Sequence, residues 1–454
     1  MKKGHRNTLL SASLTALCLA GLPATPASAQ EAPATITFQE DAPPAAVRLT
    51  LEEAKQRALA NNKLLNIGGL NAEGKAFAVK AARADYFPKV VGSVMYFHFN
   101  DDLGHVFTTQ GRTIRGLLGR PLLTFPSTTI QTAVLNEDSS FANVGVLQPI
   151  TDLLKVRQGV KLAQADQQIA QAELEAGTRK LVSGVEQLYW GLLAARRIRA
   201  GAAEGVRGAE LLAKTRLLEA RTALVEARQG LQQVDKQIAD VQEQLNGLLG
   251  LPLGTTLELV EPPLPVLPFR GADDVIGLAL AASPEIHEAQ QTILKAQAAV
   301  AAGKLDYVPS IAMVGGYVNQ TGASYMQQDI GYVGVVGSNT FVDWGKRKNI
   351  VRERQNLVVM ASLKLQQTED DVREQARKAF REVAETQEAL KTAQEMVELR
   401  KEAEKKETTP EAMRNPAPLL AATQARMLAE VDAVKADLAY RTAYVQLMSL
   451  VGQQ

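Results

Sequence analysis

Residues 85–88, Asp85-Tyr86-Phe87-Pro88, recur as Asp306-Tyr307-Val308-Pro309, at an offset of 221 positions (306 − 85). Further along the chain, Asp152 corresponds to Asp343 at an offset of 191 (343 − 152). The difference between the two offsets places thirty extra residues in the first copy, between its proline and Asp152. A repeat of this length indicates that the chain contains two copies of one structural unit.

The repeat predicts two units joined by a short linker. The first unit covers residues 49–260 and the second covers residues 271–452. Between them, residues 261–270 include EPPLPVLP, which cannot continue a helix because proline lacks a backbone N–H, and this stretch is predicted to be a linker. Residues 30–48 are predicted to be a flexible segment before the first unit.

Each unit is predicted to contain helices, two short strands and a long helical hairpin, in that order. The strands are predicted at about residues 90–99, 141–148, 310–319 and 330–336, which are rich in valine and aromatic residues. The hairpins are predicted at about 152–249 and 344–451, where apolar residues recur at spacings of three, four and seven. The fold class is therefore mostly α with a small β part.

The start of the first unit, from Leu49 to Ala84, has a helical pattern. Thr50 and Glu53 have the spacing of a capping box, which marks a helix N-terminus. The pattern stops shortly before Pro88, where helices commonly end.

Residues 1–29 have the features of a secretory signal peptide. A positively charged start and an apolar stretch are followed by Ala27-Ser28-Ala29, which suits the cleavage site. Cys18, the one cysteine of the chain, lies in the apolar stretch, so the mature protein is predicted to have no disulfide. A lipoprotein signal at Cys18 is the alternative, which Leu17 disfavours because a small residue is expected before a lipidated cysteine.

Charge and hydropathy exclude two further classes. Loss of the three basic residues of the signal peptide changes the net charge from +1 to about −2, which offers no basic surface to nucleic acid. No later stretch has the roughly twenty apolar residues of a transmembrane helix, so entry into a membrane would require strands. Because a barrel needs about eight strands, several chains would have to share one.

The sequence resembles the TolC family of outer-membrane efflux proteins over residues 47–452. The resemblance rests on the order and duplication of modest motifs, which are Leu49-Thr50-Leu51-Glu52-Glu53-Ala54, Ala58-Leu59, Asn61-Asn62, Pro88, Pro309, Gln148-Pro149-Ile150-Thr151-Asp152 and Phe341-Val342-Asp343-Trp344-Gly345-Lys346-Arg347. It implies a homotrimer in the outer membrane of a Gram-negative-type cell. Each chain would give four strands to a shared, 12-stranded β-barrel in outer-membrane lipid and its hairpins to a periplasmic α-barrel.

The resemblance also implies a function and partners. The chain would be the passive outer-membrane channel of a tripartite efflux pump or type I secretion system, gated at the hairpin tips. Its partners would be a periplasmic adaptor (membrane fusion) protein and an inner-membrane transporter. The tips map near residues 205–216 and 407–418, and the candidate aperture or adaptor-contact residues are Lys214, Arg216, Arg414 and Asn415. The Val-Gly-Leu-like turn that family members often carry at the tips is absent here, so family contacts are not transferred by residue.

The extra residues of the first unit, between Asn100 and Ser140, are predicted to form an outward loop or plug. Arg112, Arg115 and Arg120 are candidate constriction residues that would favour anionic solutes. A solvated surface loop is the other interpretation.

The junctions between strands and helices are predicted to be structural. Their residues are Pro88, Pro149, Asp152, Pro309, Asp343 and Gly345. Asp152 and Asp343 are expected at helix N-termini, where a carboxylate accepts hydrogen bonds from free amides and meets the positive end of the helix dipole.

No catalytic, cofactor-binding or metal site is predicted. His98 and His105 are the nearest approach to a metal pair, but no suitably spaced cysteine or carboxylate accompanies them. A periplasmic hydrolase would need a nucleophile, a base and an orienting group, and no such set is recognisable. A secreted or periplasmic coiled-coil scaffold without a pore remains the alternative, which the duplicated strands disfavour because a rod does not need them.

Overall fold

The computed structural model describes residues 47–101, 103–109, 111–115, 121–125, 127–213, 218–323, 326–407 and 417–453. The predicted signal peptide, the tip residues Lys214, Arg216, Arg414 and Asn415, and Arg120 lie outside these ranges.

Each unit begins with a short helix and a longer one. These are α1 (Leu51–Asn61) and α2 (Lys63–Ala84) in the first unit, and α5 (Ala272–Ala282) and α6 (Pro284–Leu305) in the second. The predicted capping box is present, with the Thr50 amide donating to Glu53 Oε2 at 2.8 Å and the Glu53 amide donating to Thr50 Oγ1 at 3.3 Å. The helical pattern of residues 49–84 is divided into two helices at Asn62, whose side chain accepts hydrogen bonds from two amides at the start of α2.

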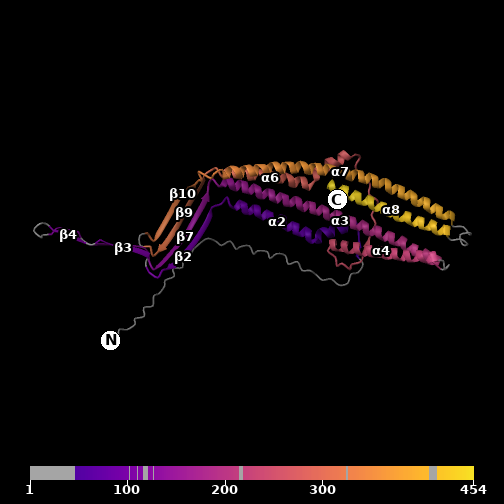
Figure 1. Cartoon of the computed structure of the whole chain (residues 1–454), viewed down its shortest axis with the longest axis horizontal. Coiled ribbons are helices and arrows are strands. Elements are labelled where there is room, and N and C mark those ends of the chain that lie inside the picture. The colour runs from indigo at the N-terminus through magenta and orange to yellow at the C-terminus, as the bar shows by residue number, and fades with distance from the viewer. Residues whose placement is uncertain are drawn as a thin grey trace, which may run out of the picture. The chain divides into compact units, whose positions relative to one another are not determined.

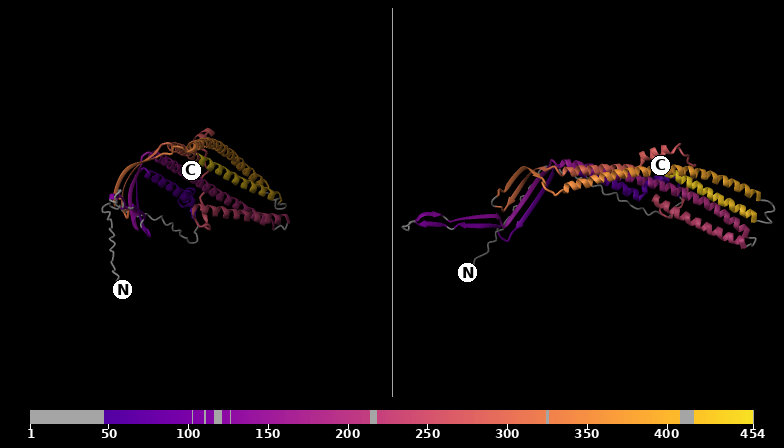
Figure 2. Two further views of the ribbon diagram at one scale, coloured as in Figure 1. Left: turned by 60° about the vertical axis from the view of Figure 1, so that its left-hand side comes forward. Right: turned by 45° about the horizontal axis from the view of Figure 1, so that its top comes forward.

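Two long helical hairpins contain the four longest helices of the described residues. They are α3 (Leu153–Ala213) with α4 (Leu218–Leu249), and α7 (Lys346–Glu407) with α8 (Ala417–Leu450). Figures 1 and 2 show α3 and α8 side by side, and Arg197 on α3 pairs with Asp437 on α8 at 3.1 Å. A β-carbon at Gly205 on α3 would lie 2.5 Å from Met427 Cε on α8, so the two hairpins pack closely there. Helices of this length depend on such packing for stability.

A four-stranded antiparallel sheet joins the two units. Its strands are β2 (Lys89–His98), β7 (Asp138–Pro149), β9 (Ser310–Thr321) and β10 (Asp329–Ser338). The order is β10-β9-β7-β2, which Figure 1 shows beside one end of the long helices. Within each unit the two strands pair as the repeat predicts, and pairing of β7 with β9 links the units.

The insertion of the first unit, predicted to be an outward loop or plug, contains four strands that were not predicted. It contains β3 (Leu103–Thr109), β4 (Arg112–Arg115), β5 (Pro121–Phe125) and β6 (Thr128–Leu135). β3 pairs with β6 and β4 pairs with β5, both antiparallel. Residues 103–109 and 128–135 are rich in threonine and branched or aromatic residues, which favour strands, so the signal was present in the sequence.

The segment predicted to be flexible, residues 30–48, includes the start of a strand, which is a second correction. β1 (Val47–Leu49) pairs in parallel with β8 (Leu257–Leu259), and neither strand was predicted. Tyr189 on α3 holds this pair in place, since its hydroxyl lies 3.0 Å from Leu49 O and 2.5 Å from Val260 O and shares its one proton between them. A three-residue parallel pair depends on such distant contacts, so local sequence does not reveal it.

The core is divided between the two units. One buried cluster surrounds Tyr189 and Leu249, and the other surrounds Tyr440 and Val383. The proline-rich linker, residues 261–270, lies against the second cluster, where Tyr440 Oη donates to Pro265 O at 2.8 Å. None of the described helices combines the length and apolar character needed to cross a membrane.

Candidate functional site: the sheet faces and the strand–helix junction

One face of the four-stranded sheet is lined by valines. Residues that pair directly across strands lie on the same face, so the register places Val90, Val94, Val144, Val146 and Val333 together. We call this the valine face. Val94 is 80% exposed and Val333 is 86% exposed. An apolar surface this exposed indicates contact with lipid or with another apolar surface.

The opposite face, which we call the second face, carries polar and small residues among its apolar ones. Ser93 on β2 is paired with Asn143 on β7, and Gly145 is paired with Gly316 on β9. Tyr332 on β10 lies across both glycines, because a β-carbon at Gly145 would be 3.3 Å from its hydroxyl oxygen. Val91, Leu147 and Val336 also lie on this face, so it too presents exposed apolar side chains.

Both edges of the sheet are open. Among the described residues, β2 pairs only with β7, and β10 pairs only with β9. Unpaired edges do not occur in lipid because each free N–H and C=O would lack a hydrogen-bond partner. The sheet is therefore incomplete as a membrane-spanning structure and requires further strands beside β2 and β10.

The predicted junction residues of the second unit lie together before α7. The Asp343 carboxylate accepts from the amides of Gly345 and Arg347, both at 3.1 Å, so it occupies the expected place at a helix N-terminus. Hydrogen bonds from the side chain and amide of Arg347 lower the pKa of Asp343. The Arg347 guanidinium also donates to Asp306 O at 3.1 Å and lies 5.0 Å from the ring centroid of Tyr307. These contacts tie the end of α6 to the start of α7.

The corresponding aspartate of the first unit behaves differently. Asp152 lies directly before α3, but its carboxylate accepts from Ser310 Oγ at 2.5 Å and pairs with Lys155 at 3.4 Å. Lys155 also pairs with Asp306 at 3.2 Å. The expectation that Asp152 caps amides is thus replaced by a bridge between the two units, because Ser310 begins β9.

The junction prolines mark the helix–strand boundaries. Pro88 stands between α2 and β2, Pro309 stands between α6 and β9, and Pro149 ends β7. The C-terminal caps before the first two prolines, Asp85 and Asp306, have nearly the same backbone angles, with φ −68° and ψ −9° against φ −69° and ψ −12°. The repeat in the sequence is therefore a repeat of helix-end geometry.

The turn before α7 exposes an aromatic side chain. Trp344 has a φ of 54° and is 95% exposed, and Gly345 follows with a φ of 85°. A left-handed backbone conformation is unfavourable for a bulky residue, and it is retained where surrounding contacts hold the backbone in place. The bonds from Gly345 and Arg347 to Asp343 supply that constraint, and leave the indole facing outward.

The candidate arginines of the insertion fall into two groups. Arg112 and Arg115 are the first and last residues of β4, whereas Arg120 lies outside the described residues. The prediction that they form a constriction remains a prediction.

His98 contacts a carboxylate on the neighbouring strand. Its Nδ1 lies 2.8 Å from Asp138 Oδ1, which also accepts from Tyr96 Oη at 2.7 Å. In the part of the chain that the structure describes, no three His, Cys, Asp or Glu residues are grouped as a metal site would require.

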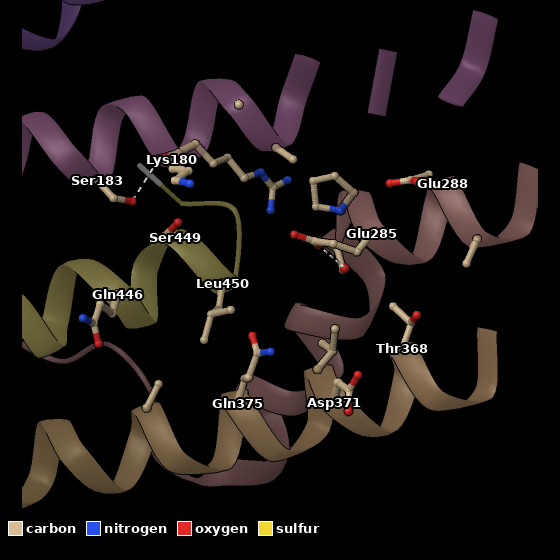
Figure 3. Close-up of a pocket in the computed structure, with 18 of the residues that line it drawn as sticks. Lys180, Ser183, Glu285, Glu288, Thr368, Asp371, Gln375, Gln446, Ser449 and Leu450 are labelled. Carbon is tan, nitrogen blue, oxygen red and sulfur yellow. Dashed lines mark hydrogen bonds between the residues drawn. The ribbon is translucent and has the colours of Figure 1, made fainter. Parts of the chain in front are cut away.

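A groove lies between the long helices, away from the sheet. It has a volume of about 1190 Å³ and is lined by α3, α6, α7 and α8. Figure 3 shows Lys180 and Ser183 facing Glu285 and Glu288 across it, with Asp371 on a third side. Burial raises the pKa of Glu288, and the nearby acidic groups add to the effect. Side chains of both signs line the groove, so it does not select a ligand of one charge.

A largely buried ion pair links α1 to α3 near β1. Lys55 Nζ on α1 lies 2.9 Å from Glu186 Oε1 on α3 and 2.9 Å from Glu52 Oε1. Burial raises the pKa of Glu186, although Lys55 opposes the shift. Sequence reasoning missed this pair because its partners are far apart in the chain.

Solved structures of similar fold decide the architecture. The outer-membrane channel OprN is similar with a TM-score of 0.72 at 17% identity, over 89% of this chain and 90% of that one. The chain has the fold of an outer-membrane channel. The CmeC outer membrane channel of Campylobacter jejuni gives a TM-score of 0.65 at 15% identity, over 89% of this chain and 85% of that one. The open state of the Neisseria gonorrhoeae MtrE outer membrane channel gives a TM-score of 0.65 at 17% identity, over 92% of this chain and 94% of that one.

The channel fold confirms the predicted fold class, which was mostly α with a small β part, and confirms the resemblance to the TolC family at the level of the fold. No family model and no curated protein matches the sequence.

Proposed function

We propose that this chain is one subunit of a homotrimeric outer-membrane channel that conducts substrates outward for an efflux or secretion system. The observation that carries the proposal is a four-stranded sheet with an exposed valine face and two open edges. Three chains would place β2 of one protomer beside β10 of the next and close twelve strands. Twelve is above the roughly eight strands that a barrel requires.

The sequence resemblance supplies the finer part of the proposal. The long hairpins would extend into the periplasm and meet an adaptor protein bound to an inner-membrane transporter. The chain would then be a conduit and not an enzyme, with energy supplied by the transporter. Its tip residues, Lys214, Arg216, Arg414 and Asn415, would face the adaptor or the aperture.

The test is the mass of the detergent-extracted protein from outer membranes. Three chains per particle would support the shared barrel, and a water-soluble monomer absent from that membrane would leave the pore-free scaffold. Val94→Arg places a charge on the valine face. It is expected to lower the stability of the membrane-inserted protein by about 2–4 kcal/mol. Val225→Arg on α4 is the matched control, because Val225 is also exposed, at 65%, but lies on a helix. A trimer that tolerates both substitutions equally would contradict a lipid-facing valine face.

A further inference from the structure

The two units repeat their structure with the same offsets as their sequence. Val94 on β2 pairs with Ala142 on β7. Their equivalents in the second unit are Gly315 (94 + 221) and Val333 (142 + 191), and these two residues also pair directly. The helices α5 and α6 likewise begin and end 221 residues after α1 and α2. The repeat therefore preserves the strand register residue by residue.

One joint inside the chain connects the two units edge to edge. It consists of β7 paired with β9 and of α3 packed against α6. In the order of packing, β2 and α2 form one edge of the chain, and β10 and α7 form the other edge (Figure 1). By the repeat, β10 and α7 correspond to β7 and α3, whereas β2 and α2 correspond to β9 and α6. The two edges of the chain are therefore the two halves of a second joint of the same kind.

The joint inside the chain has an ion pair where the sheet meets the helices. Lys155 Nζ, near the start of α3, lies 3.2 Å from Asp306 Oδ1, at the end of α6. Their equivalents are Lys346 (155 + 191), which begins α7, and Asp85 (306 − 221), which follows α2, so both charges are repeated. Lys346 is exposed and no ion pair of its side chain is seen among the described residues, whereas exposed Asp85 pairs with Lys89 of its own chain at 3.1 Å. Each edge thus offers one charge of a pair that the chain does not form within itself.

A second contact of the joint leads to the same result. The Ser310 hydroxyl, at the start of β9, donates to the Asp152 carboxylate before α3. Their equivalents are Lys89 (310 − 221) and Asp343 (152 + 191), which have opposite charges. The two contacts together would alternate the charges of two neighbouring protomers at this level.

The outer faces of α2 and α7 supply apolar surface for the same joint. Phe77 on α2 is 56% exposed, and its equivalent on α6 is Ala298 (77 + 221), which is buried beside α3. Val359 on α7 is 57% exposed, and its equivalent on α3 is Gln168 (359 − 191), which faces α6 across a narrow groove. Further exposed apolar residues on these two helices are Leu64, Ile67, Leu70, Leu357, Met360 and Leu363. Apolar surface of this extent along two edge helices indicates that a partner covers it.

The proposed function supplies a second copy of the chain as that partner, and the inference rests on it. Head-to-tail contacts between identical chains close into a ring when every chain uses the same two surfaces in the same way. We propose that neighbouring protomers are joined by a copy of the joint inside the chain, which pairs β10 of one with β2 of the next in a single register and brings Lys346 to Asp85. The chain's own internal joint is then the template for its assembly.

The register of the new strand pair follows from the internal one. Val144 on β7 pairs with Tyr317 on β9. The equivalent of Val144 is Val335 (144 + 191) on β10, and Tyr317 is the equivalent of Tyr96 (317 − 221) on β2. Val335 of one protomer is therefore placed opposite Tyr96 of the next, so that a valine–tyrosine pair occurs at both kinds of boundary.

Disulfide cross-linking in outer membranes tests this register. The mature protein is predicted to lack cysteine, so Tyr96→Cys with Val335→Cys introduces two thiols into a chain without others. Directly paired residues of antiparallel strands have Cα atoms about 4.5–5.5 Å apart, which a disulfide can span. A membrane-permeable oxidant is expected to produce covalent dimers and trimers on a non-reducing gel.

Tyr96→Cys with Val333→Cys is the matched control. Val333 lies on the same strand and the same face as Val335, but the proposed register places it diagonally from Tyr96, with Cα atoms about 7–8 Å apart, which is too far for a disulfide. This pair is expected to remain monomeric on the gel, and cross-linking of it in place of the test pair would overturn the register. If the test pair does not assemble, Met95→Cys with Val336→Cys tests the same register on the second face.

Charge reversal tests the ion pair. Lys346→Glu would place a carboxylate beside Asp85 of the next protomer and is expected to lower the temperature at which the extracted trimer dissociates. Adding Asp85→Lys restores opposite charges and is expected to raise that temperature again. Lys348→Glu makes the same change of charge two residues along α7 and should have the smaller effect. Equal losses in the two single variants, without recovery in the exchanged pair, would overturn the pairing.

The particle mass separates failure of this inference from failure of the proposed function. A three-chain particle in which the Tyr96→Cys and Val335→Cys thiols do not cross-link, and the Met95→Cys and Val336→Cys thiols do not either, would overturn the joint and leave the channel. A particle without three chains would overturn the proposed function itself.

Discussion

Tyr332 on β10 lies over Gly316 on the neighbouring strand, so that a β-carbon added at Gly316 would be 2.7 Å from the tyrosine hydroxyl oxygen and 2.8 Å from the ring carbon that bears it. The glycine therefore makes room for an aromatic ring that lies flat on the second face. Gly145, on the strand beyond, continues the same surface. Without these glycines the ring would have to project from the sheet.

Gly316→Val is expected to displace Tyr332 and to lower stability. The added side chain would overlap the tyrosine and would also approach the backbone oxygen of Val144 to 2.7 Å. Overpacking of this kind costs about 1–3 kcal/mol. The measurement is the temperature at which the detergent-extracted oligomer dissociates. Gly331→Val is the control, because nothing lies within 4 Å of a β-carbon at that position. If the two substitutions lower the dissociation temperature equally, the proposed contact between residue 316 and Tyr332 is wrong.

Tyr189→Phe is expected to loosen the β1–β8 pair. The hydroxyl shares its one proton between Leu49 O and Val260 O in a buried site, and its loss leaves both carbonyl groups without that donor. The expected cost is about 1–3 kcal/mol. The measurement is amide hydrogen exchange at residues 47–49 and 257–259, which should become faster in the variant. Tyr86→Phe removes a hydroxyl for which no hydrogen bond is seen among the described residues, and should leave exchange there unchanged.

The stability contributed by Glu186 is expected to fall as pH rises. Burial raises its pKa above the ordinary value of 4.5, so the folded chain keeps a proton that the unfolded chain has released. Unfolding then releases a proton, and the free energy of unfolding decreases with rising pH from about 4.5 through the raised pKa. Measured between pH 4 and pH 8, the wild type should lose stability relative to Glu186→Gln.

The control for the pH series is Val225→Ala on α4, a substitution of an exposed side chain that does not titrate, and its difference from the wild type should be the same at every pH. A wild-type advantage over Glu186→Gln that grows with pH would mean that the pKa of Glu186 is lowered and not raised.

Arg426→Leu is expected to loosen the second hairpin near its turn. Arg426 on α8 lies 2.6 Å from Glu404 Oε2 on α7 and 2.6 Å from Glu430 Oε1. Loss of this partly buried pair should cost about 1–2 kcal/mol and speed amide exchange in residues 400–407. Lys435→Leu, whose pair with Asp432 is exposed and lies within one helix, should leave that exchange unchanged.

Local sequence patterns located most of the channel fold. The proline motifs at Pro88 and Pro309 predicted two helix-to-strand changes, and the observed strands begin one residue after each. The heptad-like spacing predicted both hairpins, whose helices begin at Leu153 and Lys346. These features are local, because proline restricts the backbone conformation of the residue before it, and helical periodicity is set by residues three and four apart.

Partners distant in the sequence were not predictable in the same way. The sequence pattern placed Asp152 at a helix start correctly but could not show that its carboxylate binds Ser310, which is 158 residues away. The insertion strands were not predicted, although residues 103–109 and 128–135 are rich in residues that favour strands. The hydrogen bonds from Tyr96 to Asp138 at 2.7 Å and from Tyr317 to Asp329 at 2.6 Å were not predicted either, although the two pairs are related by the repeat offsets of 221 (317 − 96) and 191 (329 − 138).

The amino-acid sequence by itself determined the two-fold repeat, the order of helices and strands, and the absence of any helix pattern suited to a membrane. The tertiary structure alone decided that β7 pairs with β9, and this pairing brings the two units into one sheet. It also decided which residues share a face, because strand periodicity is two and a shift of one residue would exchange the faces. The valine face and the placement of Tyr332 over Gly316 both follow from that register, which no local pattern specifies.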